Sequence, residues 1–273
     1  MSWIEALVLG LVQGLTEFLP ISSSAHQSIV GQLFGGRDVG AAFTAVTQLG
    51  TETAVIVYFA KDIGRIISHW FKSLFTKVPR DDPDARIGWL VIIGSIPIVV
   101  LGLLLQNRID TTFRNLWLTV AMLAGFSVII AIADRTARTI KPLEKLSWRD
   151  GIFFGLAQSL ALVPGVSRSG ATISAGLAMG YTREAATRYS FLLAIPAVFG
   201  SGLYELTKIN DDPVAPAWGQ IGLATVVSFV VGLGVIHWLL RYVSTHNFMP
   251  FVIYRIILAV VVAVLLVTGV LVA

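Results

Sequence analysis

The sequence predicts an all-α polytopic membrane protein with six transmembrane helices and two re-entrant helical hairpins, arranged as two inverted-topology repeats. Composition, the lengths of the apolar segments and an internal repeat lead to this prediction. Of the 273 residues, 55% are hydrophobic and only 13% are charged, whereas a soluble domain carries about 25% charged residues. Because so little polar surface is available, we expect the chain to lie in a lipid bilayer.

Six segments are long and apolar enough to cross the hydrocarbon core, which takes about 20 residues. They cover residues 39–60, 87–105, 115–133, 184–207, 217–240 and 249–272. Residues 62–77 carry charges at helical spacing, so we expect an interfacial amphipathic helix there.

Residues 2–34 and 150–181 are also apolar but are interrupted near their middles. Pro20 and three serines break the first segment, and Pro164–Gly165 with the SRSG stretch breaks the second. Each half is about a dozen residues long, which is too short to cross alone. Each segment therefore predicts a re-entrant hairpin, whose irregular backbone must be buried in protein or line a wet cavity.

The two interrupted segments match each other at an offset of 145 residues, from Gln13 to Gln158. One hairpin and three spans therefore occur twice within a single membrane domain. Repeat one covers about 2–133, repeat two covers about 150–272, and 134–149 is a cytoplasmic linker. Because three crossings is an odd number, we expect the second copy to be inverted, with the binding site near the repeat interface.

The loop charges predict the orientation. Lys and Arg are concentrated in the loops at 61–86 and 134–149, while the opposite side has only Arg37, Arg108, Arg114 and Lys208. The basic loops should be cytoplasmic, which puts both termini outside. The net charge of +4 then needs no nucleic-acid partner, and the absence of cysteine excludes disulfides and thiolate sites.

The two breaks predict a buried anion site. Serines after each break are good N-caps, so two helix N-termini should point into the protein, where free N–H groups bind anions. Arg168 adds a fixed charge with a fork suited to phosphate, although it could instead be an ion-pair partner of Glu17. His26 is either a hydrogen-bonded core histidine or an acid–base or nucleophilic group. We expect Arg255 to extend to the cytoplasmic surface.

Two motifs carry a family resemblance. QGLTE, from Gln13 to Glu17, resembles the (E/Q)xxxE motif of the undecaprenyl-diphosphatases, the bacitracin-resistance protein family. PGVSRSGAT, from Pro164 to Thr172, resembles the more specific PGxSRSxxT motif of that family. FLPISSSAH and FLLAIPA are similar as well, so the resemblance covers essentially the whole chain. It implies a multi-pass phosphatase of the bacterial cell membrane that regenerates the C55 glycan carrier by removing its terminal phosphate.

The resemblance also implies the site residues. The expected catalytic residues are Glu17, Ser23, His26 and Arg168, and the expected substrate-binding residues are Gln13, Ser22, Ser167, Ser169 and Thr172. A divalent cation, Mg²⁺ or Ca²⁺, is implied, with Glu17 as a ligand. Gln13 stands where the family often has Glu and cannot ionise. Glu52 either replaces that carboxylate as a metal ligand or pairs with an arginine.

The expected reaction is phosphoryl transfer to water from a prenyl diphosphate lipid, in a site that opens to the outer face. Either Ser23 or His26 attacks, and Glu17 orients or deprotonates the attacking group. The oligomeric state, including a homodimer, is left open. One alternative is a secondary transporter or lipid flippase, because inverted repeats with broken helices are typical of transporters. Another is a non-catalytic protein that binds lipid or bacitracin.

Overall fold

The computed structural model describes residues 1–35, 40–75, 78–79, 81–208 and 217–273. Three of the loop charges, Arg37, Lys77 and Arg80, lie outside these residues. The α-helices of the described part are α1 (Trp3–Thr16), α2 (Ser23–Gly35), α3 (Ala41–Tyr58), α4 (Ala60–Leu74), α5 (Pro83–Asp110), α6 (Leu116–Thr136), α7 (Trp148–Ser159), α8 (Arg168–Ala178), α9 (Arg183–Lys208), α10 (Trp218–Val243) and α11 (Met249–Val267). Short 3-10 turns lie at Thr112–Arg114, Leu143–Lys145 and Leu160–Leu162.

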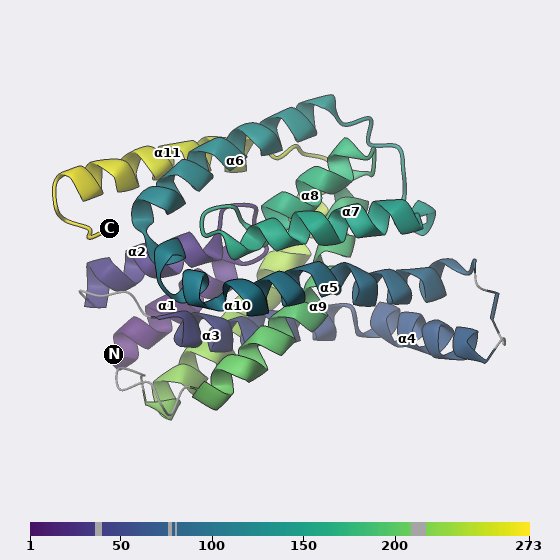
Figure 1. The fold of residues 1–273 in the computed structure, drawn as a ribbon, viewed down its shortest axis with the longest axis horizontal. Coiled ribbons are helices and arrows are strands. Elements are labelled where there is room, and N and C mark those ends of the chain that lie inside the picture. Colours follow the sequence, from purple (N-terminus) through teal and green to yellow (C-terminus); the bar gives the residue numbers. More distant parts are fainter. Residues whose placement is uncertain (36–39, 76–77, 80, 209–216) are drawn as a thin grey trace.

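The helical, polytopic character of the chain is confirmed. Five helices among the described residues, α5, α6, α9, α10 and α11, are long and apolar enough to cross a membrane. The predicted span at 39–60 is helical as α3, but α3 is not among these five. Its 18 residues include Thr47, Gln48, Thr51 and Glu52. In Figure 1 both termini lie at one end of the molecule, and α4 lies toward the other.

Both interrupted segments fold as two helices joined by a break. Residues 17–22 separate α1 from α2, and the 3-10 turn at Leu160–Leu162 followed by residues 163–167 separates α7 from α8. In each break a serine adopts a left-handed backbone conformation, with φ +73° at Ser22 and +74° at Ser167. This conformation is costly for a residue other than glycine and persists only where the surroundings hold it. The two serines are equivalent at the 145-residue offset.

Glycines let the first helix of each interrupted segment approach a long helix closely. A Cβ atom on Gly10 of α1 would lie 2.6 Å from the Ala224 carbonyl oxygen of α10. A Cβ atom on Gly155 of α7 would lie 2.5 Å from the Gly94 carbonyl oxygen of α5. Small residues at such crossings are typical of membrane helix packing, because they bring the backbones together.

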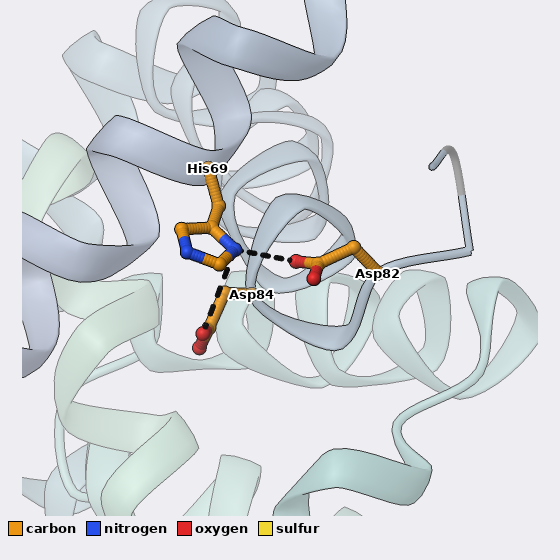
Figure 2. A group of neighbouring side chains, drawn as sticks. All are labelled: His69, Asp82 and Asp84. Carbon is orange, nitrogen blue, oxygen red and sulfur yellow. Dashed lines mark hydrogen bonds and ion pairs between the residues drawn. The ribbon is translucent and has the colours of Figure 1, made fainter. Parts of the chain in front are cut away.

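The helix predicted at 62–77 is present as α4, which begins two residues earlier, and residues 76–77 of the predicted range lie outside the described residues. A polar cluster ties it to the N-terminus of α5 (Figure 2). His69 Nδ1 lies 3.0 Å from Asp82 Oδ1, which also accepts the Ala85 N–H and so caps α5. Asp84 accepts from Arg65 Nε at 2.8 Å. Because Arg65 already supplies positive charge to this cluster, we interpret the cluster as a structural contact between two helices.

Candidate active site

The two breaks meet at an ion pair between Glu17, in the first break, and Arg168, which follows the second break. Glu17 directly follows α1, Ser23 begins α2 and Arg168 begins α8. Glu17 Oε1 accepts from Arg168 Nη2 at 2.9 Å, and Glu17 Oε2 accepts from Ser23 Oγ at 2.6 Å. These side chains are buried or nearly so, with Arg168 9% and Glu17 3% exposed. The structure therefore joins three of the predicted catalytic residues in one hydrogen-bonded group.

Glu52 on α3 approaches the same guanidinium nitrogen of Arg168 as Glu17 does. Its Oε2 is 3.6 Å from Arg168 Nη2, so the pairing with an arginine that the sequence left open is present. Neither oxygen of Glu52 has a hydrogen-bond donor within the described part of the chain, although the residue is fully buried. Arg168 Nη1 is likewise a buried donor without an acceptor among these residues. The site therefore contains two carboxyl oxygens and one guanidinium nitrogen that have no hydrogen-bond partner among the described residues.

Two of the predicted substrate-binding serines cap helices. Ser22 Oγ accepts the Ala25 N–H at 3.4 Å, and Ser167 Oγ accepts the Gly170 N–H at 3.2 Å. Each also lies 3.2 Å from the hydroxyl two residues further on, Ser24 and Ser169 respectively. The cap interpretation of Ser22 therefore matches the contacts, and the two N-termini have the same local geometry.

The remaining predicted binding residues make internal contacts. Gln13 is buried and donates from Nε2 to Glu17 Oε2 at 2.8 Å, so it orients the carboxylate with an amide donor. Ser169 donates to the Leu19 carbonyl of the first break at 3.0 Å. Thr172 Oγ1 is 2.8 Å from the Arg168 carbonyl and 2.5 Å from Ser190 Oγ. These contacts hold the two breaks and α9 together around Arg168.

His26 is placed differently from Ser23. Its Nδ1 lies 2.7 Å from the Ser22 carbonyl and its Nε2 lies 2.7 Å from the Tyr254 hydroxyl. His26 and Tyr254 line an apolar groove of about 820 Å³ between α1, α10 and α11. Sequence reasoning missed Tyr254, because a tyrosine in an apolar span is common at membrane interfaces.

The expectation that Arg255 extends to the cytoplasmic surface is wrong. Arg255 is fully buried, and its guanidinium donates to the Pro20 carbonyl at 3.2 Å and the Gly165 carbonyl at 2.7 Å. It also donates to Ser127 Oγ at 2.9 Å. The breaks leave carbonyls without helical partners, and in a membrane such groups must be satisfied internally. A polar residue at depth signals a role, but its partners could not be read from the sequence.

The fold and the site define a class, a polytopic helical membrane protein whose buried guanidinium, carboxylate and serine meet where two helices break. The family model "Bacitracin resistance protein BacA" matches residues 6–261. The chain belongs to this family.

Curated relatives agree over nearly their whole lengths. An "Undecaprenyl-diphosphatase" of Micrococcus luteus is 61% identical over 274 residues, which cover 99% of each chain. One of Renibacterium salmoninarum is 61% identical, covering 99% of this chain and 98% of the relative. An "Undecaprenyl-diphosphatase 2" of Streptomyces coelicolor is 57% identical over 284 residues, covering 99% of this chain and 97% of the relative.

Proposed function

We propose that this protein hydrolyses undecaprenyl diphosphate to undecaprenyl phosphate and inorganic phosphate, which recycles the lipid carrier of cell-wall glycan synthesis and confers bacitracin resistance. The names of the relatives and the family supply the reaction. The observation that carries the proposal is the Ser23–Glu17–Arg168 group, because it combines a hydroxyl, a base and a cation at two helix N-termini. Phosphoryl transfer depends on this kind of positioning and charge stabilisation.

Ser23 is the nucleophile in this proposal. Its Oγ lies 2.6 Å from Glu17, whereas His26 contacts Ser22 and Tyr254 instead. As Ser23 Oγ bonds to the terminal phosphorus, its proton passes to Glu17. The bond from phosphorus to the bridging oxygen breaks, and its electron pair stays with the lipid phosphate. Arg168 Nη1, which has no acceptor among the described residues, donates to the transferring phosphoryl oxygens.

His26 serves the second step. It lies three residues after Ser23 on α2, so both side chains share one helix face. Water attacks the phosphorus of phosphorylated Ser23, and its proton is taken up by the His26 imidazole. The bond between phosphorus and Ser23 Oγ breaks, and Glu17 returns its proton to that oxygen.

A divalent cation suits the residues of this site. Two carboxyl groups, those of Glu17 and Glu52, lie beside one guanidinium, and a diphosphate brings negative charge of its own, which a cation would balance. Mg²⁺ is commonly held by one or two carboxylates together with substrate phosphates and water. Glu52 has oxygens without hydrogen-bond donors within the described residues, whereas both Glu17 oxygens already accept. Glu52 would therefore be the main ligand and Glu17 the second, and the cation would neutralise phosphate charge.

The apolar groove suits the prenyl tail. It is lined by Val12 and Leu15 of α1, Val231 and Val235 of α10, and Phe251 of α11, with His26 and Tyr254 as polar members. Because lipid tails are as apolar as the groove, the isoprenoid chain would be held there by van der Waals packing against these side chains. The groove would keep the chain among helices while the diphosphate reaches the breaks.

We further propose six spans, with α3 as the sixth, and two re-entrant hairpins in inverted repeats that open the site to the outer face. The helix pairings support the repeat: α1 packs against α10 as α7 packs against α5, and α3 packs against α10 as α9 packs against α5. The equivalent left-handed serines support it too.

Phosphate release tests the proposed reaction. Purified protein in detergent should release inorganic phosphate from undecaprenyl diphosphate. Ser23→Ala should lower kcat more than about 100-fold, while Ser24→Ala, whose hydroxyl contacts only Ser22 among the described residues, should retain turnover. If the wild-type protein moves the lipid across proteoliposomes but releases no phosphate, it is a transporter and the proposal is wrong. Equal rates for the two variants would exclude Ser23 as the nucleophile.

A further inference from the structure

The His26 imidazole is held at both of its nitrogens. Nδ1 lies 2.7 Å from the Ser22 carbonyl oxygen, and Nε2 lies 2.7 Å from Tyr254 Oη. The two rings are nearly parallel, with an interplanar angle of 5° and centroids 5.6 Å apart. Ser22 is also the left-handed residue of the first break. The break and α11 therefore fix the ring from opposite sides.

These contacts determine where the imidazole carries its proton. A carbonyl oxygen can only accept, so Nδ1 must be the N–H donor to Ser22. In the neutral ring Nε2 is then an acceptor, and Tyr254 must donate its hydroxyl proton to it. The single lone pair of Nε2 is occupied by this bond. A proton that reaches His26 from outside must therefore arrive through Tyr254 Oη, which has acceptor capacity left.

We propose that Tyr254 is a proton-relay residue of the active site, placed between the attacking water and His26. This inference rests on the proposed hydrolysis and its second step. The water gives its proton to Tyr254 Oη while Tyr254 passes its own proton to His26 Nε2. The hydroxide adds to the phosphorus of phosphorylated Ser23, and the Ser23 Oγ–P bond breaks. Tyr254 ends the step neutral, and His26 carries the added proton until it is lost to solvent.

The position of Tyr254 fits this task. Its side chain is 43% exposed and lines the groove beside His26, so the protein does not enclose its hydroxyl. Ser23 instead gives its proton to Glu17, a contact that does not involve His26 or Tyr254. The two half-reactions therefore use different proton acceptors, Glu17 for the attack by serine and the Tyr254–His26 pair for the attack by water.

Tyr254→Phe tests the relay, and the chain offers a matched control. Tyr58 also contacts a histidine, with its hydroxyl 3.3 Å from His237 Nδ1, and neither residue belongs to a break. We expect Tyr254→Phe to lower kcat about 100-fold, since a general acid–base contribution is typically 10²- to 10⁴-fold, and to leave kcat/KM unchanged because only the second step is slowed. Phosphorylated Ser23 should accumulate after a burst of undecaprenyl phosphate. Tyr58→Phe should show neither effect.

A double mutant and a spectroscopic measurement complete the test. Adding Tyr254→Phe to His26→Ala should lower kcat no further, because the tyrosine acts through the histidine. In ¹⁵N spectra of the four histidines, Tyr254→Phe should move the His26 Nε2 signal toward that of an unbonded acceptor nitrogen. Normal turnover of Tyr254→Phe, additive losses in the double mutant, or a slowed first step without phospho-serine would overturn the relay. Absence of phosphate release by the wild-type protein would instead overturn the proposed function, and the spectra would still report the Tyr254–His26 bond.

Discussion

Arg168 is the residue on which both charges of the site converge, since it pairs with Glu17 and lies beside Glu52. The SRSG stretch was enough to single it out, because a serine cap next to an arginine at a helix break predicts an anion site. The sequence could not decide whether Arg168 also pairs with a second carboxylate, that of Glu52. Glu52 stands in a different span, and which side of α3 faces the breaks depends on packing against α9 and α10.

Arg168→Lys should lower kcat/KM about 100-fold, because a point charge on a flexible stem cannot replace two directed donors. Phosphate release in detergent measures the effect. Arg188→Lys is the control, because Arg188 is 39% exposed and pairs with Glu184 on its own helix. Normal activity of Arg168→Lys would show that the guanidinium fork is not used.

Glu52→Gln should weaken divalent-cation binding at least about 10-fold, since even outer-shell changes at metal sites cost 10- to 100-fold. Mn²⁺ titration of the purified protein by electron paramagnetic resonance measures this without turnover. Glu184→Gln, an exposed carboxylate, should leave the affinity unchanged. Equal affinities in the two variants would remove Glu52 from the cation site.

At the scale of elements, the helix breaks could be predicted from Pro20, Pro164 and the serine clusters, because proline removes a backbone donor and serine caps the next helix. The close crossings between helices could not be predicted from the sequence. A glycine in an apolar helix has many roles, and only the packed structure shows that Gly155 lies against Gly94.

Gly155→Ala should destabilise the protein by about 1–3 kcal/mol, the usual cost of overpacking, because its Cβ would lie 2.5 Å from a backbone oxygen. Thermal unfolding in detergent measures the change. Gly222→Ala on α10 is the matched control, since a Cβ there meets no atom within 4 Å. Its better helix propensity should leave stability equal or slightly higher. Equal losses in both variants would contradict the close crossing.

The tie between α4 and α5 should depend on pH. Burial opposes ionisation of Asp82, but the Ala85 N–H and the His69 ring outweigh it and hold the pKa of Asp82 below its usual range. A lowered folded-state pKa stabilises the fold above the unfolded value, about 3.9, and this stabilisation is lost as pH falls through the lower folded value.

Asp82→Asn keeps a capping side chain but loses the charge. It should lower the unfolding temperature at pH 6, and the difference from wild type should begin to shrink below about pH 4 and vanish only below the lower folded-state pKa of Asp82. Asp81→Asn, at an exposed neighbouring position, should match wild type throughout. A difference for Asp82→Asn that is constant with pH would contradict the charge argument.

For the whole molecule, a membrane location follows from composition alone, since 13% charged residues cannot cover a soluble surface. The number of spans is harder to predict from the sequence. Its polar inward face makes α3 weakly apolar even though it is helical throughout, so a count by hydropathy differs from a count by helices. Arg255 illustrates the same limit, because an arginine near a span end is read as a surface residue until its partners are known.

The proposed orientation can be tested with single cysteines, because the chain has none of its own. Cysteines at Ser2 and Thr268 should react with an impermeant maleimide on intact cells, whereas one at Arg138 should react only after permeabilisation. Labelling of Arg138→Cys in intact cells, with Ser2→Cys protected, would invert the orientation.

The contacts of Arg255 also bear on how the protein is made. This residue and Tyr254 both lie on α11, which follows every other described helix, while their partners Pro20 and His26 lie in the first break and in α2 respectively. During synthesis the first interrupted segment must therefore enter the membrane before the Pro20 carbonyl and His26 Nε2 have their partners from α11. The active site is therefore completed only when α11 is in place. A chain halted before α11 would lack Tyr254 and Arg255, so His26 and the first break would not yet be held in position.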